Sequence, residues 1–197
     1  MNGKSDASTL TQTKNPLPGD LAIWVFIFAE LLVFGILFAA YAVARSSHLE
    51  LFNSEQKLLN TRLALINTFL LITSSYAVVR SVLSIKINEV NACVRWLLLA
   101  IGLGAVFLIL KVVEFRNDSD LGITLSHNLF DMFYLSLTFF HFLHVILGML
   151  ILGAVAWKAY SHKYNAQSHA GVETGGAYWH MVDLLWIILF ALVYVIH

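Results

Sequence analysis

Two histidines lie deep inside a long apolar stretch of this chain, with no charged residue nearby in the sequence to balance them. His141 and His144 stand within residues 138–148, which read TFFHFLHVILG. Their spacing of three residues places both side chains on the same face of a helix, one turn apart. Ionisable groups at membrane depth are costly, so each is expected to face protein, water or a ligand. The chemistry open to such a pair is haem or metal ligation, or hydrogen bonding within a helix bundle.

Glu30 is the most deeply placed carboxylate of the apolar segments. It lies about 15 Å into the first segment by the helical rise per residue, where an ionised carboxylate is costly. We therefore expect Glu30 to be uncharged and hydrogen bonded inside the bundle, with His144 or His141 as its partner. A structural hydrogen bond and a proton-relay role both suit this residue. We favour the structural one, because buried polar networks often serve only to hold helices together.

Two further groups of ionisable residues lie near the ends of the apolar segments. Lys111 and Glu114 stand three residues apart near the expected outer end of the third segment, and Asp131 lies near the outer start of the fourth. An ion cluster at that membrane interface would satisfy all three, and we favour a salt-bridge network over an ion-binding site. His180 and Asp183, also three residues apart, are expected to bond to each other or to the preceding loop.

A haem held between His180 and His141 or His144 is disfavoured by depth. Bis-histidine ligation needs two ligands at one level, but His141 and His144 lie near the centre of a long helix, whereas His180 is expected about 7 Å inside the next one. Haem or metal ligation remains an alternative. The single cysteine, Cys93, excludes an internal disulfide and any cysteine-based haem attachment or metal cluster built from this chain alone.

The composition indicates that membrane helices hold these residues. The chain has 197 residues, of which 59% are apolar and only 12% charged. Its mean hydropathy of +0.76 is above that of ordinary soluble domains. Twelve basic and twelve acidic residues give a formal net charge of zero, so no basic field attracts nucleic acid and nucleic-acid binding is excluded.

We expect an all-α, polytopic membrane protein with a bundle of five transmembrane helices. Each apolar segment is long enough to cross a hydrocarbon core of roughly 30 Å. Residues 1–19 are expected to form a flexible polar tail that precedes the membrane domain, residues 20–197, with Asp20 as the N-cap of the first helix. The expected helices are about 21–44, 63–85, 92–115, 127–160 and 177–196.

Basic residues and tryptophans predict how the bundle is oriented. With the N-terminus inside, the inner side carries seven lysines and arginines and the outer side five, which favours an inside N-terminus and an outside C-terminus. Trp24, Trp96, Trp157 and Trp179 all fall near the expected inner interface, as an aromatic belt would place them.

Motifs in the same order along the chain resemble subunit III of haem–copper oxidases. Residues 178–186, YWHMVDLLW, are similar to the family's YWHFVDxxW, and residues 138–148 resemble its TGFHGxHVxxG, from which they depart at Phe139 and Phe142. The LLNT of residues 58–61, the AELLVF that contains Glu30, and Glu114-Phe115 also match. The short length, the HFLHV of residues 141–145 and the KVVEF of residues 111–115 most resemble the five-helix, NorE-type branch associated with nitric oxide reductase.

The resemblance implies an accessory subunit of the bacterial inner membrane, without its own redox centre. Such a subunit packs on a catalytic subunit of a haem–copper oxidase or nitric oxide reductase, which holds the haem and the copper or non-haem iron, in aerobic respiration or denitrification. The family also supports proton uptake and durability during turnover, and binds membrane lipids in a cleft that in seven-helix members uses the first two helices. Glu30 matches the position associated with carbodiimide modification.

Two other classes of function remain open. A self-contained haem-b membrane anchor or electron carrier predicts a b-type Soret band from the isolated chain. A small proton-coupled transporter predicts that Glu30→Gln abolishes substrate flux in liposomes.

Overall fold

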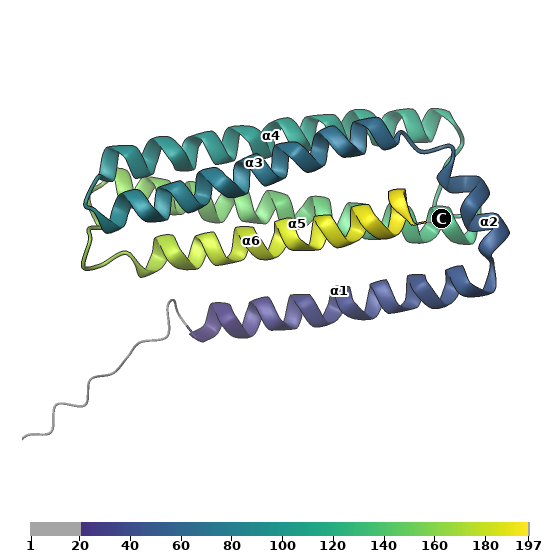
Figure 1. Ribbon diagram of the computed structural model, residues 1–197, viewed down its shortest axis with the longest axis horizontal. Helices are drawn as coiled ribbons and strands as arrows, with labels where there is room; N and C mark the ends of the chain where they lie inside the picture. Colours follow the sequence, from purple (N-terminus) through teal and green to yellow (C-terminus); the bar gives the residue numbers. More distant parts are fainter. Residues whose placement is uncertain (1–20, 197) are drawn as a thin grey trace, which may run out of the picture.

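The computed structural model describes residues 21–196, and every regular element among them is a helix. The elements are α1 (Leu21–Ser47), α2 (Leu49–Gln56), α3 (Thr61–Lys86), α4 (Val90–Asp120), α5 (Leu129–Tyr160), α6 (Ala170–Phe190) and the π-helix η1 (Ala191–Val195) (Figure 1). Helices α1, α3, α4 and α5, and α6 together with η1, are long and apolar enough to span a membrane, which confirms the predicted five-helix membrane fold. The expected tail 1–19 and the expected cap Asp20 lie outside the described residues.

Two asparagines set the starts of membrane helices. The Oδ1 atom of Asn60 accepts a hydrogen bond from the backbone N–H of Leu63 at 3.1 Å, and that of Asn128 accepts one from Asp131 at 2.7 Å. Each bond satisfies an N–H group that has no partner inside the helix. Asn60 belongs to the LLNT motif, so that motif has a local structural reason: it begins α3.

The helices differ from those expected at three places. The polar stretch 48–57 contains the short helix α2, α4 continues to Asp120 instead of ending near residue 115, and α6 begins seven residues before the expected position 177. The start of α6 reads AGVETGG, a poor helix-forming sequence that packing stabilises. A Cβ atom on Gly175 would lie 3.1 Å from Val155, and one on Gly176 would lie 3.3 Å from Val78. The bare backbone therefore packs closely against α5 and α3.

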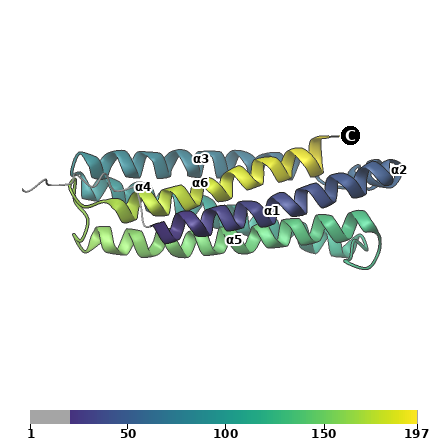
Figure 2. The same cartoon turned by 90° about the horizontal axis from the view of Figure 1, so that it is seen from below.

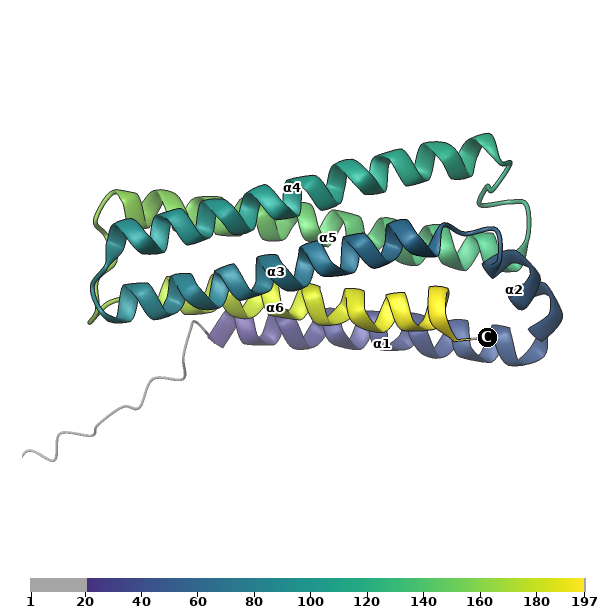
Figure 3. The ribbon, with the colours of Figure 1, turned by 45° about the horizontal axis from the view of Figure 1, so that its top comes forward.

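Helices α3, α4, α5 and α6 form a four-helix bundle, and α1 lies along its outside. Figures 1 and 2 show α1 running along the seam between α5 and α6, joined to α3 through α2 at one end of the bundle. Figure 3 shows α4 on the far side of the bundle from α1. Helix α6 is the central element: 56% of its most apolar window is buried, against 11% for α1. The apolar surface that remains on α1 suits contact with lipid or another membrane protein.

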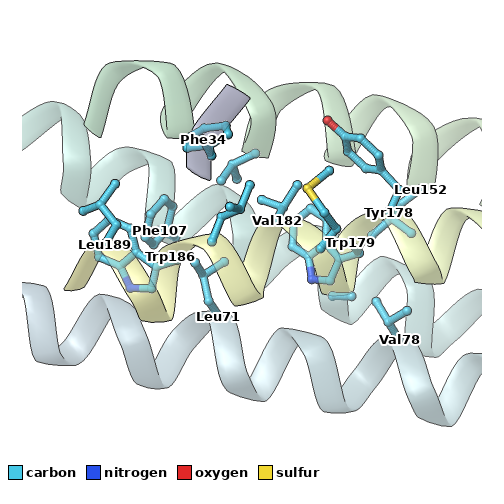
Figure 4. Packing of buried hydrophobic residues seen from close by; sticks show 14 of the residues in the cluster. Phe34, Leu71, Val78, Phe107, Leu152, Tyr178, Trp179, Val182, Trp186 and Leu189 are labelled. Atoms are coloured by element: carbon cyan, nitrogen blue, oxygen red, sulfur yellow. The ribbon is translucent and has the colours of Figure 1, made fainter. Parts of the chain in front are cut away.

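The core is built around the large side chains of α6. Trp179, Val182, Trp186 and Leu189 point from α6 toward its neighbours in the bundle (Figure 4). Trp179 is 1% exposed, so its expected place in an aromatic belt at the membrane interface is wrong. Because α6 begins early, Trp179 lies nine residues, about 13 Å, inside the helix.

Trp179 fits because glycine stands opposite it on two helices. A Cβ on Gly148 of α5 would lie 2.9 Å from the indole ring, as would one on Gly104 of α4. We predict that Gly148→Ala lowers the free energy of unfolding in detergent by about 1–3 kcal/mol, because the extra methyl group displaces a fully enclosed ring. Gly153→Ala on the same helix is the matched control, since nothing lies within 4 Å of its Cβ position. Equal stability of the two variants would contradict close packing at Trp179.

Candidate functional site

A hydrogen bond between Glu30 and His144 joins α1 to α5. Glu30 Oε2 lies 2.9 Å from His144 Nε2, and the other ring nitrogen, Nδ1, lies 2.7 Å from the backbone oxygen of Phe140. A carbonyl oxygen only accepts hydrogen bonds, so Nδ1 carries a proton. Nε2 then either accepts a proton from Glu30 or donates one to its carboxylate. In both cases the pair shares one proton and has no net charge, which suits its depth in the membrane.

The Glu30–His144 pair lies at the edge of the bundle. The side chain of Glu30 is 21% exposed and that of His144 is 11% exposed. The rings of His144 and Phe34 of α1 pack in a T-shaped arrangement, with ring centroids 5.1 Å apart. The shared proton is therefore close to the outer surface of the bundle, beside the seam between α1 and α5.

His141 turns into the bundle instead of toward Glu30. Its side chain is fully buried, and its ring lies 5.2 Å from Trp186 and 5.9 Å from Phe107 between centroids. Neither ring nitrogen has a hydrogen-bond partner within the described part of the chain. The two histidines of the motif thus have different roles: His144 makes the polar contact to α1, and His141 packs among aromatic rings.

A fully buried ion pair forms the centre of a second polar group. Lys111 Nζ lies 3.0 Å from Glu114 Oε2, with the two side chains only 1% and 2% exposed. The hydroxyl of Tyr194, on η1, accepts a hydrogen bond from Lys111 at 3.0 Å and donates one to Glu114 Oε1 at 2.7 Å. Aromatic rings also surround the ammonium group, at 5.1–5.7 Å from their centroids: Phe115, Tyr134, Trp186 and Tyr194. Such rings stabilise a cation through their π faces.

Tyr134 of α5 extends this network to a second carboxylate of α4. Its hydroxyl lies 2.7 Å from Asp118 Oδ2 and 3.2 Å from Glu114 Oε1. The shorter contact makes Asp118 the main acceptor of its single proton. Lys111, Glu114, Asp118, Tyr134 and Tyr194 therefore form one buried network, called here the Lys111 network, which ties α4 and α5 to η1.

Asp131 does not join the expected cluster with Lys111 and Glu114. It is buried, and its Oδ2 atom lies 2.8 Å from His127 Nδ1 one turn before it. Asp118 takes the place expected for Asp131, because α4 continues past residue 115 and carries Asp118 on the same face as Glu114. The network is also buried inside the bundle, which differs from the interfacial cluster expected.

The π-helix η1 and the short helix α2 hold Tyr194 in place. Gln56, the last residue of α2, donates hydrogen bonds to the backbone oxygens of Val193 at 3.0 Å and Leu192 at 3.4 Å. The hydroxyl of Tyr41 on α1 also lies 3.3 Å from the Leu192 oxygen. Both oxygens lie in the last turn of the helix, where carbonyl groups have no backbone partner inside the helix, so they are available to side chains. Helix α2 therefore acts on the Lys111 network from outside, through the backbone of η1.

His180 and Asp183 do not bond to each other among the described residues. His180 Nδ1 lies 2.6 Å from the hydroxyl oxygen of Ser75 on α3, and Asp183 Oδ1 is buried without a hydrogen-bond partner in that same part of the chain. His180 lies ten residues, about 15 Å, inside α6, deeper than expected. His141 contacts Trp186, which lies six residues, about 9 Å, beyond His180 along α6. His141 and His180 are therefore at different depths along the bundle.

Within residues 21–196 no group of three His, Cys, Asp or Glu side chains is placed to hold a metal ion.

Sequence reasoning missed Asp118, Tyr134, Tyr194 and Gln56. One signal was available: Lys111, Glu114 and Asp118 follow one another at spacings of three and four, which is a charged stripe along one helix face. The tyrosines carried no such signal, because they were counted as apolar residues.

Comparison with known proteins identifies similar chains. A family model described as cytochrome c oxidase subunit III matches residues 14–197. Cytochrome c oxidase subunit 3 of Thermostichus vulcanus is 38% identical over 177 residues, which cover 89% of this chain and 86% of the relative. That of Corynebacterium diphtheriae is 30% identical over 174 residues, 87% and 85% of the two chains. That of a Synechocystis species is 36% identical over 114 residues, 57% of this chain and 48% of the relative. The first two relatives are close to this chain in length, so a short chain does not by itself indicate the nitric oxide reductase branch.

We predict that Lys111→Met lowers the free energy of unfolding by about 3–5 kcal/mol, because it leaves the buried carboxyl group of Glu114 without its ion-pair partner. Adding Glu114→Gln to that variant should restore much of the loss, since both charges are then gone. Unfolding of the purified chain in detergent measures both effects.

Lys86→Met is the matched control for this prediction. Lys86 forms a 2.8 Å ion pair with Glu173, but the two side chains are 47% and 24% exposed, so the loss should stay below about 1 kcal/mol. A similar cost for Lys86→Met and Lys111→Met would mean that the buried network contributes nothing special.

Proposed function

Because the chain belongs to the cytochrome c oxidase subunit III family, we propose that it is a non-catalytic membrane subunit of a respiratory haem–copper oxidase. It packs on the catalytic subunit, which holds the haem and copper, and supports the assembly and stability of that subunit during turnover. The complex lies in the plasma membrane of a bacterium, with the N-terminus of this chain inside and its C-terminus outside.

The observation that carries this proposal is that the buried charges of Lys111 and Glu114 neutralise each other inside the bundle. Lys111 and Glu114 are almost completely buried, and Tyr194 bonds to both. A catalytic or transport site needs polar groups that a substrate can reach. A closed network instead fixes the relative positions of helices, which is what a supporting subunit requires.

The Glu30–His144 pair supports a further part of the proposal, an aid to proton uptake. The pair shares one proton at the edge of the bundle, so a proton can move between its two atoms without changing the net charge. By the family resemblance, the partner subunit is the destination of such protons. When the pair gives its shared proton toward the catalytic subunit, it is left as a carboxylate anion, and a proton taken up from the aqueous phase restores the neutral pair.

We predict that the tagged full-length chain, purified in mild detergent, brings down a haem–copper oxidase catalytic subunit that mass spectrometry identifies. A tagged, unrelated membrane protein of similar length should not. Recovery of a nitric oxide reductase catalytic subunit would select the second candidate function, which the HFLHV and KVVEF motifs favour. A stoichiometric b-type Soret band from the chain alone would instead establish a haem-b anchor and refute the proposal.

We predict that Glu30→Gln leaves assembly intact but reduces proton uptake during turnover of the complex. A glutamine side chain can still bond to His144, but it cannot exchange a proton with it. The loss should be partial, because the chemistry takes place in the other subunit. Glu50→Gln on α2 is the control, since Glu50 is an exposed carboxylate. Equal uptake by the Glu30→Gln complex and the wild-type complex would limit Glu30 to a structural role, without affecting the assignment as a subunit.

A further inference from the structure

Loss of the shared proton leaves Glu30 and His144 unable to bond to each other. The Nδ1 atom of His144 holds its own proton against the backbone oxygen of Phe140, so Nε2 is left with only a lone pair. A carboxylate also only accepts hydrogen bonds, so the 2.9 Å contact between Oε2 and Nε2 becomes a contact between two acceptors. An anionic Glu30 therefore needs a different donor, because an unpaired carboxylate at membrane depth is costly.

Tyr178 of α6 carries a buried hydroxyl group that has no hydrogen-bond partner within residues 21–196. The whole residue is 1% exposed. Figure 4 shows its ring extending from α6 toward α5 with the hydroxyl oxygen at the far end, and its Cε1 atom lies 3.3 Å from the position of a Cβ on Gly148. Buried hydroxyl groups are hydrogen bonded in nearly all proteins, so a partner is expected for this one in some state of the molecule.

The Tyr178 side chain lies beside the turn of α1 that precedes Glu30. Its ring stacks on that of Phe26, with centroids 6.0 Å apart and planes 19° apart. Phe26 and Glu30 are four residues apart and so lie on one face of α1. Side chains on a helix lean toward its N-terminus, which brings the carboxyl group of Glu30 over the turn of Phe26. The charge of an ionised Glu30 acts on the Tyr178 hydroxyl from there.

The other titratable side chains of α1, α5 and α6 are directed elsewhere. His141 turns inward among aromatic rings, and His180 and Asp183 lie beside Ser75 of α3. Within residues 21–196, His144 and Tyr178 are therefore the titratable groups that face Glu30. The remaining ones lie toward the helix ends or in the Lys111 network: Tyr41, Arg45, Asp131, Tyr134, Lys158, Tyr160, Glu173 and Tyr194.

We propose that Tyr178 donates a hydrogen bond to the Glu30 carboxylate when the Glu30–His144 pair has released its proton. Such a role rests on the proposed aid to proton uptake, in which the pair alternates between a neutral and an anionic state. Tyr178 is a positioning residue: it keeps its own proton, stabilises the anion, and so makes release of the shared proton easier. Return of a proton re-forms the 2.9 Å bond to His144 and frees the hydroxyl.

The test is the pH dependence of carbodiimide labelling of Glu30, measured on the purified full-length chain in detergent by mass spectrometry of the Glu30 peptide. Carbodiimides react with protonated carboxyl groups, so the labelling rate follows the fraction of pairs that still hold the shared proton. Tyr178→Phe keeps the ring but removes the donor. Half-maximal labelling should move to higher pH by about one to two units, because a hydrogen bond to a charged group changes a protonation equilibrium by roughly 10- to 100-fold.

Tyr41→Phe is the matched control. It removes another buried tyrosine hydroxyl, which bonds to the Leu192 backbone oxygen near the other end of α1, and it should leave the labelling profile unchanged. Equal labelling of both variants and the wild type at low pH would show that α1 remains in place.

An unchanged midpoint in Tyr178→Phe, a shift to lower pH, or an equal shift in Tyr41→Phe would overturn the proposal. The proposed uptake role can fail separately. If Tyr178→Phe moves the midpoint as expected while Glu30→Gln leaves proton uptake by the complex unchanged, the Tyr178 hydrogen bond is supported and the uptake role is refuted.

Discussion

A lysine enclosed in a membrane bundle must be neutralised from within the protein, and much of this structure follows from that requirement at Lys111. Glu114 supplies the opposite charge on the same helix, and Tyr194 bonds to both partners. Tyr194 reaches them from a π turn whose free backbone oxygens are bound by Gln56. One buried charge thus accounts for the position of η1 and, through it, for that of α2. Isolated buried charges are too costly to persist, so these elements depend on one another.

Helix α1 is attached differently from the other four membrane helices. It contributes little to the core and lies along the seam between α5 and α6, where Glu30 bonds to His144. At its other end, Tyr41 packs against Phe52 and lies within hydrogen-bond distance of the η1 backbone. The bundle therefore has a closely packed four-helix part and a peripheral helix held at a few polar and aromatic points. Such an arrangement leaves most of the apolar surface of α1 for contacts outside the chain.

The number of membrane helices and their order could be predicted from hydropathy, because long apolar runs have few alternative structures in lipid. The helical structure of two segments, α2 and the first turns of α6, could not be predicted in this way. Helix α2 has only eight residues, too few for an apolar period to be recognised, and it is held by Phe52, which packs against Tyr41, and by the hydrogen bonds of Gln56. The start of α6 contains glycines that favour a loop locally, but close contact with Val155 and Val78 stabilises the helix there. Because α6 begins earlier than expected, Trp179 and His180 lie deeper in the bundle than the sequence predicts.

Glu30 and His144 could be paired because few partners exist for a carboxylate at that depth. Asp118 was overlooked because α4 was expected to end too early.

The separation of Lys111 and Tyr194 along the chain has a consequence for biosynthesis. They are 83 residues apart, so α4 enters the membrane well before the ribosome has made its tyrosine partner. Glu114, one turn from Lys111, is the charge that makes early insertion feasible, because the two neutralise each other within one helix. The complete network can form only after α5 and η1 have followed. Until then, the Lys111–Glu114 ion pair lacks the hydrogen bonds that Tyr194 supplies in the complete bundle.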